Sequence, residues 1–295
     1  MKIFTSGARC VGSQIERIEE GFLQLNHEII TDITLADLIY VNNAWYDEVI
    51  TAKQSGRIRG KIVFTVLDLA PHVPDFPVQK LKEQLGYADH ICTISKFVQQ
   101  DLKNRTGFDS TVIYQPIKKV YRTGIKKHNF KAMLVGRVND PAKKARESVM
   151  ALMSAGFNGG DVVTVGREQP FYGGSWANSA SDEFLNELYN SVDFVMCMSE
   201  SEGMGLPALE AMSVGAIPVL PYNLTTREEF FPSQVFPEYT FIKDSESAKD
   251  FMLTLIRDKG IMEDMKSRLV KHYQDNWSEK LSGVGVAKKV LEVVK

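Results

Sequence analysis

The apolar residues of this chain fall into short runs that alternate with stretches of helical periodicity. Short apolar runs bounded by glycine, proline or charged residues predict strands buried on both faces, as in a parallel sheet. Between them, apolar residues spaced three and four apart predict amphipathic helices, as over residues 14–25. The alternation predicts an α/β fold in which helices connect parallel strands.

The pattern places these elements at definite positions. We expect strands at 1–5, 27–32, 38–41, 61–67, 131–135, 161–165, 194–198 and 216–220. We expect helices at 14–25, 46–53, 147–155, 249–259, 262–274 and 280–295.

The most informative stretch is 199–218, S-E-S-E-G-M-G-L-P-A-L-E-A-M-S-V-G-A-I-P, which reads as strand end, glycine loop, short helix and next strand. Gly203 and Gly205 allow a tight turn and a close approach of a ligand to the backbone amides. Pro207 suits the first helical position, where its missing N–H costs nothing. The helix therefore aims free N–H groups at the loop, which makes an anion site.

Two glutamates flank this predicted anion site. Glu202 precedes the helix and Glu210 lies on its first turns, so we expect both to line one pocket. A carboxylate is a good acceptor for the vicinal hydroxyls of a sugar or a ribose. Hydroxyl binding next to phosphate binding indicates a nucleotide sugar as the ligand.

Composition fits a soluble globular protein. The 295 residues, 44% hydrophobic and 24% charged, suffice for one large domain or two ordinary ones. The net charge of −2 gives no global attraction to nucleic acid or to anionic membranes. Residues 118–146, however, carry ten basic side chains against one acidic, so anions are expected to bind there.

The cysteines and the N-terminal sequence indicate a cytoplasmic protein. Three widely separated cysteines, Cys10, Cys92 and Cys197, form neither a disulfide framework nor a metal-ligand spacing. The first residues lead directly into a strand, without a secretory apolar region. No apolar run is long enough to span a membrane, so no transmembrane segment is expected.

The stretch 199–218 resembles the E-x7-E signature of retaining GT-B glycosyltransferases, of the group 1 or family 4 type. The resemblance implies two Rossmann-like domains that face each other across a cleft. It implies that Glu202 binds hydroxyls of the donor sugar and that Glu210 binds the ribose. The backbone amides expected to bind the sugar–phosphate portion are those of Gly203, Met204, Gly205 and Leu206.

A second resemblance lies in G-R-V-N-D-P-A-K-K, residues 136–144. The family places an arginine directly after a strand and a lysine six residues later, both on the donor diphosphate. Arg137 and Lys143 have that spacing, and Lys144 is a candidate to share the role. A guanidinium fork and an ammonium suit a diphosphate whose negative charge grows as the sugar leaves.

The N-terminal half resembles the family more loosely, chiefly over residues 84–117. There the resemblance implies a strand and then a helix within 88–107, with Ser95 at the N-cap and Gly107 at the end of the helix, followed by a strand at 112–117. In the second half it implies a helix at 182–193 before the strand that leads to Glu202. In the family the first glycine loop faces the donor phosphates and the acceptor, which makes Gly12 and Ser13 candidates beside a purely structural turn. A histidine–aspartate pair often follows a later strand. Here Leu67 precedes Asp68, and His72 follows four residues on, so either Asp68 or His72 takes the histidine's place.

The resemblance predicts three segments: an N-terminal acceptor-side domain at 1–122, a nucleotide-sugar-binding domain at 123–278, and a helix at 279–295 that returns to the first domain. It implies a retaining, nucleotide-sugar-dependent glycosyltransferase. The donor is a UDP-, GDP- or ADP-sugar. We expect no cofactor and no metal, since the chain has neither D-x-D nor a His/Cys cluster.

The acceptor and the reaction class leave alternatives. A glycan, a lipid-linked sugar or a nucleic acid, including a modified DNA base as in virus-type enzymes, are possible acceptors. The same fold also serves nucleotide-sugar epimerases and hydrolases. A non-catalytic nucleotide-sugar-binding protein is the third hypothesis, prompted by the missing histidine at position 67.

Overall fold

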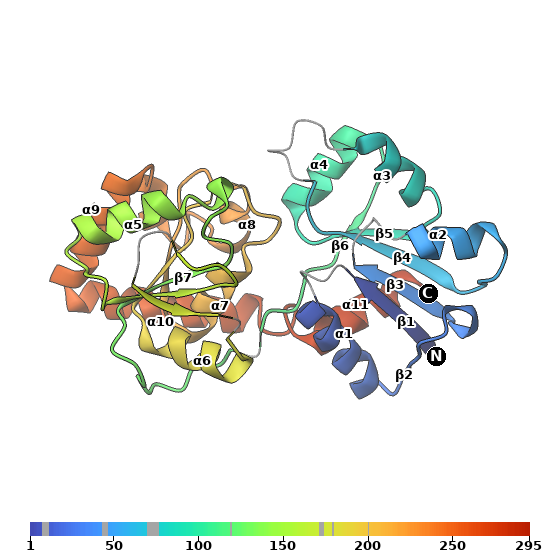
Figure 1. Ribbon diagram of the computed structural model, residues 1–295, viewed down its shortest axis with the longest axis horizontal. Helices are drawn as coiled ribbons and strands as arrows, with labels where there is room; N and C mark the ends of the chain where they lie inside the picture. Colours follow the sequence, from blue (N-terminus) through green and yellow to red (C-terminus); the bar gives the residue numbers. More distant parts are fainter. Residues whose placement is uncertain are drawn as a thin grey trace. The chain divides into compact units, whose positions relative to one another are not determined.

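The computed structural model describes residues 1–7, 12–42, 47–69, 77–118, 120–170, 174–178, 180–199 and 201–295. The chain forms two compact units (Figure 1), one of Met1–Pro116 with Glu279–Lys295 and one of Ile117–Ser278. Each unit contains a parallel sheet with helices packed around it, so the expected α/β class is confirmed. The sequence placed the end of the first domain at residue 122, and the first unit ends at Pro116.

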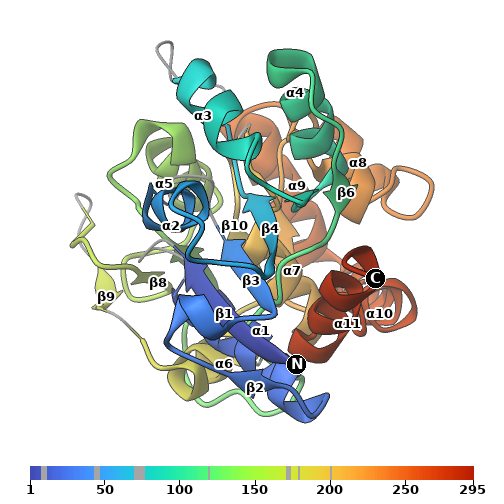
Figure 2. The same cartoon turned by 90° about the vertical axis from the view of Figure 1, so that its right-hand side faces the viewer.

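The first unit is built on a six-stranded parallel sheet in the order β2-β1-β3-β4-β5-β6, whose strands β1, β3 and β4 lie side by side in Figure 2. The strands are β1 Lys2–Gly7, β2 Glu28–Ile29, β3 Leu38–Asn42, β4 Lys61–Val66, β5 His90–Thr93 and β6 Thr111–Val112. Strand order reverses between β1 and β3, where Gly7 lies opposite Asn42. Loops that leave carboxyl ends at such a reversal form the usual ligand crevice of an open α/β sheet.

Helices surround this sheet, and the last helix of the chain is among them. They are α1 Gly12–Gln24, the short 3-10 helix η2 Ile33–Leu35, α2 Asp47–Gln54, α3 Val78–Leu85, α4 Lys96–Thr106 and α11 Gly283–Val293. Val286 and Val290 of α11 share a buried core with Ile18 and Phe22 of α1. A Cβ added to Gly283 would lie 2.1 Å from the carbonyl oxygen of Arg17, so glycine permits this close helix contact.

The second unit has a five-stranded parallel sheet in the order β11-β10-β7-β8-β9. The strands are β7 Ala132–Val135, β8 Val162–Val165, β9 Ser175–Ala177, β10 Phe194–Met196 and β11 Ile217–Val219. The chain passes from β7 through β8 to β9 on one side, and then places β10 and β11 on the other side. Strand order therefore reverses between β7 and β10. The topology predicts a second ligand crevice at the carboxyl ends of these two strands.

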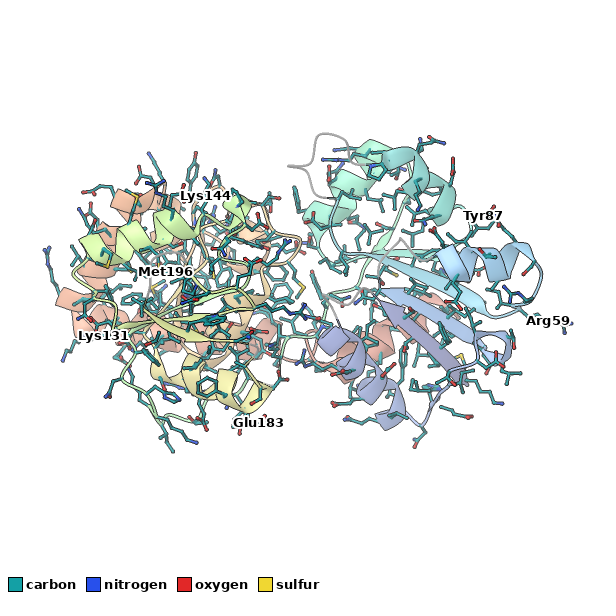
Figure 3. The ribbon with its side chains drawn as sticks, viewed as in Figure 1. Arg59, Tyr87, Lys131, Lys144, Glu183 and Met196 are labelled. Atoms are coloured by element: carbon teal, nitrogen blue, oxygen red, sulfur yellow. The ribbon has the colours of Figure 1, made fainter. Side chains whose placement is uncertain are left out.

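The helices of the second unit cover both faces of its sheet. They are η3 Pro141–Lys143, α5 Ala145–Ser154, α6 Asp182–Ser191, α7 Leu206–Val214, α8 Arg227–Phe230, η4 Pro237–Phe241, α9 Ser245–Arg257 and α10 Lys259–Asn276. Leu185 and Leu188 of α6 pack with Val195 of β10 in the core of this unit. Met196 is buried at the end of β10, whereas Lys131 and Glu183 lie at the surface (Figure 3).

Most expected elements form, and the exceptions have local causes. The strand expected at 27–32 is only Glu28–Ile29, because the Asp32 carboxylate accepts a hydrogen bond from the Thr34 amide and starts η2. The strand expected at 112–117 was wrong beyond Val112, since Pro116 has no N–H for a ladder. Helix α3 and strand β9 were not predicted. Ser95 and Gly107 cap α4 as predicted, Gly107 with φ +84°.

Candidate functional site

Two loops that the sequence singled out leave neighbouring strands of the second sheet. Strands β7 and β10 pair in parallel, with Leu134 opposite Met196, and both carboxyl ends lie at the same edge. Gly136 and Arg137 follow β7, and the loop to Glu202 follows β10. Topology alone therefore brings the two motifs together at the reversal of strand order.

An ion pair joins these two loops. Lys143 Nζ lies 2.6 Å from Glu202 Oε1, and the two side chains are 29% and 23% exposed. Lys143 ends η3, which starts where the Asp140 carboxylate accepts a hydrogen bond from the Ala142 amide at 3.0 Å. The other oxygen of Asp140 lies 3.0 Å from Arg137 Nη2. Asp140 thus pairs with the Arg137 side chain and starts the short helix that ends at Lys143, and an aspartate before a proline is a helix start that the sequence could have indicated.

Glycine backbone surrounds the start of the β7 loop. Gly136 has φ +114°, a conformation that other residues rarely adopt. A Cβ added to Gly166, which follows β8, would lie 2.3 Å from the Gly136 carbonyl oxygen. Gly136 also donates its amide to the Val165 carbonyl at 2.8 Å. The two strand ends are therefore held against each other, directly before Arg137.

Helix α7 begins one residue before the predicted first position. Gly205 is its N-cap with φ +75°, Leu206 is its first residue and Pro207 its second. Within the described ranges, the backbone amides of Gly205 and Leu206 donate no hydrogen bond. Thr225, which the sequence did not single out, bonds through its hydroxyl to both the amide and the carbonyl of Glu202, each at 3.1 Å. The loop thus keeps a carboxylate beside open helix amides, which can bind anions.

Glu210 is placed differently from Glu202. Its side chain is buried, with 3% of the residue exposed. Glu210 Oε2 accepts a hydrogen bond from the Tyr189 hydroxyl at 2.7 Å, and Oε1 accepts one from the Lys118 amide at 3.2 Å. Tyr189 was not predicted, because a tyrosine at an apolar position of α6 reads as core. The sequence placed the two glutamates in one pocket; the structure gives each its own partners.

The buried end of β10 lies close to these charges. Burial raises the pKa of the Cys197 thiol, and the Glu202 and Glu210 carboxylates raise it further, while Lys143 lowers it. Burial is also the main cause of the raised pKa of Tyr273, about 12, with a smaller contribution from Glu210. Cys197 is therefore protonated at neutral pH, and it packs against the apolar core of the second unit.

The remaining predicted residues belong to the first unit. Gly12 and Ser13 open α1 after β1, and Asp68 lies exposed just beyond the carboxyl end of β4. His72 lies outside the described residues. Asp68, Gly12 and Ser13 thus come from the carboxyl edge of the first sheet, whereas Arg137, Lys143 and both glutamates belong to the second unit.

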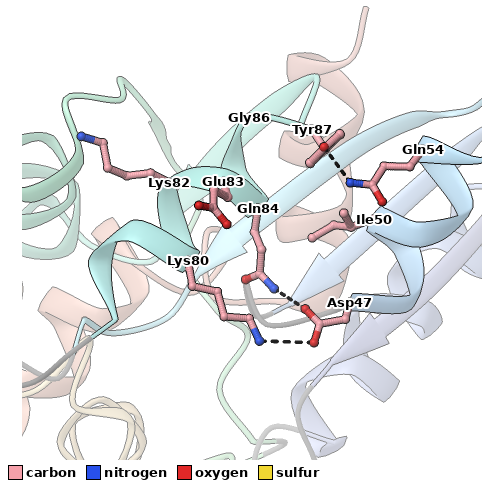
Figure 4. Close-up of a pocket in the computed structure, with 9 residues that line it drawn as sticks. All are labelled: Asp47, Ile50, Gln54, Lys80, Lys82, Glu83, Gln84, Gly86 and Tyr87. Atoms are coloured by element: carbon pink, nitrogen blue, oxygen red, sulfur yellow. Dashed lines mark hydrogen bonds and ion pairs between the residues drawn. The ribbon is translucent and has the colours of Figure 1, made fainter.

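A separate cavity of about 620 Å³ lies in the first unit between α2 and α3 (Figure 4). Asp47 at the start of α2 accepts a hydrogen bond from Gln84 Nε2 at 2.7 Å and lies 3.3 Å from Lys80 Nζ. Gln54 donates to the Tyr87 hydroxyl at 2.7 Å at the other end. None of the site residues predicted from sequence lines this cavity. Hydrogen bonds between the lining residues already occupy several of its polar groups.

Metal-binding clusters and membrane-spanning helices are both absent from the described residues. No group of three or more His, Cys, Asp or Glu side chains gathers there in a way that would hold a metal ion. Among the helices so described, none combines the length and the apolar character needed to cross a bilayer.

Comparison with known proteins gives the fold a name. No family model and no curated protein matches the sequence. Among solved structures, HepE from Anabaena, in complex with UDP and glucose, superposes with a TM-score of 0.72 at 16% identity, covering 100% of this chain and 99% of that one. WaaG, a glycosyltransferase involved in lipopolysaccharide biosynthesis, gives 0.68 at 10% identity, covering 100% of both chains.

A phage T4 protein, BGT, in complex with UDP and Mn²⁺, gives a TM-score of 0.64 at 14% identity, covering 99% of this chain and 100% of that one. Identities this low show a shared fold and nothing finer. The chain therefore has the GT-B fold that the sequence predicted.

Proposed function

We propose that this chain is a glycosyltransferase that takes its sugar from a nucleotide-sugar donor bound to the second unit. One observation carries the proposal: Lys143, Glu202 and the open amides of α7 meet at the reversal of strand order in the second sheet. A pair of cations, a carboxylate and a helix N-terminus are the groups that a sugar diphosphate requires.

The proposed roles follow from charge and position. Arg137, whose side chain is 72% exposed, and Lys143 bind the diphosphate and stabilise the negative charge that grows as the bond to the sugar breaks. Glu202 accepts hydrogen bonds from hydroxyls of the donor sugar. Glu210 accepts them from the ribose. The amides of Gly203, Met204, Gly205 and Leu206 bind the sugar–phosphate portion.

We further propose that the transfer retains the anomeric configuration. The acceptor hydroxyl attacks from the face that the diphosphate leaves, and the departing phosphate oxygen accepts the proton of that hydroxyl. No side chain then has to act as nucleophile, and electrostatic stabilisation and exclusion of water remain as the protein's main contributions. Asp68 or His72, with Gly12 and Ser13, would serve the acceptor side.

UDP-glucose is the first donor to test. HepE was solved with UDP and glucose, and the phage T4 protein BGT with its UDP-glucose substrate. Metal independence is part of the proposal, because Arg137 and Lys143 would supply the positive charge that a metal ion otherwise brings to a diphosphate. The complex of BGT with Mn²⁺ makes that part worth an explicit measurement.

We propose a neutral glycan, rather than a nucleic acid, as the acceptor. The basic segment 118–146 suggested an anionic partner, but four of its side chains outside the proposed diphosphate site are paired with carboxylates inside the second unit. These are Lys118, Lys126, Lys127 and Lys131. Paired cations attract a polyanion weakly. Salt-sensitive retention of the protein on duplex DNA would contradict this choice.

Calorimetric binding of UDP, GDP and ADP, each with and without an attached sugar, tests the donor site. We expect the wild type to bind one nucleotide selectively, and Glu210→Ala to lose that binding while remaining folded. Release of free sugar or an isomerised donor without any acceptor would favour a hydrolase or epimerase. Absence of binding to all three nucleotides would refute the proposed function.

A further inference from the structure

Tyr189 lies beneath the proposed ribose carboxylate. It belongs to α6, is 1% exposed, and packs in the apolar core of the second unit. Its hydroxyl donates a hydrogen bond of 2.7 Å to Glu210 Oε2. A core tyrosine cannot easily follow a moving partner, so the direction of this hydrogen bond is fixed by packing.

The Glu210 carboxylate is held at both oxygens. The Lys118 amide, in the segment that opens the second unit, donates to Oε1 at 3.2 Å. A carboxylate offers about four lone-pair sites, so a hydrogen bond from Tyr189 is compatible with further donors to the same group. Without these two hydrogen bonds the glutamate, which has several rotatable bonds, would have to be ordered by the ligand itself.

Tyr189 is a permanent donor over the usual pH range. Burial raises the pKa of its hydroxyl well above the ordinary value, and the charge of Glu210 raises it further. A protonated phenol facing a carboxylate forms one of the stronger classes of hydrogen bond. The Tyr189 hydroxyl therefore remains a donor to Glu210 at ordinary pH.

We propose that Tyr189 is a positioning residue that orients the Glu210 carboxylate toward the two hydroxyls of the donor ribose. This inference rests on the ribose-binding role of Glu210 in the proposed function. Tyr189 itself does not touch the nucleotide. Its contribution is to spare the ligand the cost of ordering the glutamate, and that contribution exists only when ribose hydroxyls are present to bind.

The experiment compares two probes, UDP and 2′,3′-dideoxy-UDP, by calorimetry on the wild type and on Tyr189→Phe. The dideoxy compound keeps the base and the diphosphate but offers Glu210 no hydroxyl. We expect Tyr189→Phe to weaken the binding of UDP by up to about tenfold, the cost of ordering one flexible side chain on binding. Its affinity for dideoxy-UDP should equal that of the wild type.

Tyr239→Phe is the matched control. Tyr239 is also fully buried in the second unit, and within the described residues its hydroxyl has no hydrogen-bond partner. Removing that hydroxyl should change neither affinity. Equal weakening of both probes by Tyr189→Phe would mean a general structural role, and no change in either would mean no role; each outcome overturns the inference.

Glu210→Gln separates this inference from the function on which it rests. If the wild type prefers UDP to dideoxy-UDP and Glu210→Gln abolishes the preference, the ribose role of Glu210 holds, and the Tyr189 result alone decides the inference. If wild type and Glu210→Gln both bind the two probes equally, the ribose role itself is wrong and the inference fails with it.

Discussion

Replacement of Lys143 by alanine is the sharpest test of the proposed donor site. The lysine lies 2.6 Å from Glu202 and, with Arg137, supplies the cationic side chains expected at the diphosphate. Its removal leaves the departing phosphate without one fixed positive charge. Loss of a single charge-stabilising donor typically lowers turnover about 10²-fold, which corresponds to about 2.7 kcal/mol in the barrier.

The same substitution should affect stability much less. The ion pair is partly exposed, and pairs of this kind contribute up to about 1 kcal/mol. For a unit of this size such a loss lowers the melting temperature by about 2–4 °C. Since native proteins retain about 5–15 kcal/mol of stability, the folded fraction remains almost complete. A 10²-fold loss of turnover therefore cannot come from unfolding.

The assay measures release of UDP from UDP-glucose with the best acceptor of a screen, alongside thermal unfolding. Lys127→Ala is the matched control, because Lys127 pairs with Glu187 at the same 2.6 Å on the surface of the same unit. It should leave turnover unchanged. Turnover within threefold of wild type for Lys143→Ala, or an equal loss in Lys127→Ala, would refute the assignment of Lys143 to the diphosphate.

Three other outcomes are expected. Gly166→Ala places a Cβ 2.3 Å from the Gly136 carbonyl, so it should destabilise the protein by about 1–3 kcal/mol in urea unfolding and lower nucleotide affinity by shifting the start of the Arg137 loop. EDTA should leave turnover unchanged, and a dependence on added Mn²⁺ would contradict metal independence. Burial lowers the pKa of His272, although the Phe230 carbonyl and Asp275 oppose the shift. Its neutral form is therefore favoured in the folded state, and stability should fall as pH drops below about 6.5, where the unfolded chain takes up the proton; His272→Gln should remove that part of the pH dependence.

Sequence patterns predicted most elements of the fold because apolar runs and caps are local signals. Helix α3 was missed because no side chain caps its start after Pro77, and its buried Gln84 breaks the apolar pattern. Strand β9 has only three residues, too few for a periodicity. The approach of Lys143 to Glu202 could be anticipated only from strand order, since 59 residues separate them. Tyr189 could not be anticipated, because its contact with Glu210 depends on how α6 packs against α7.

The spacing of the two glutamates acquires a physical meaning from these contacts. Glu202 precedes the N-cap of α7, where the chain is still a loop and its carboxylate can meet the lysine from the β7 side. Glu210 lies within the helix, and each helical residue turns the side-chain direction by about 100°. Only one rotational setting of the helix directs Glu210 to Tyr189 and the Lys118 amide. The helix start at Gly205 fixes that setting, so the glycine loop determines both the position of the proposed anion site and the orientation of the buried carboxylate.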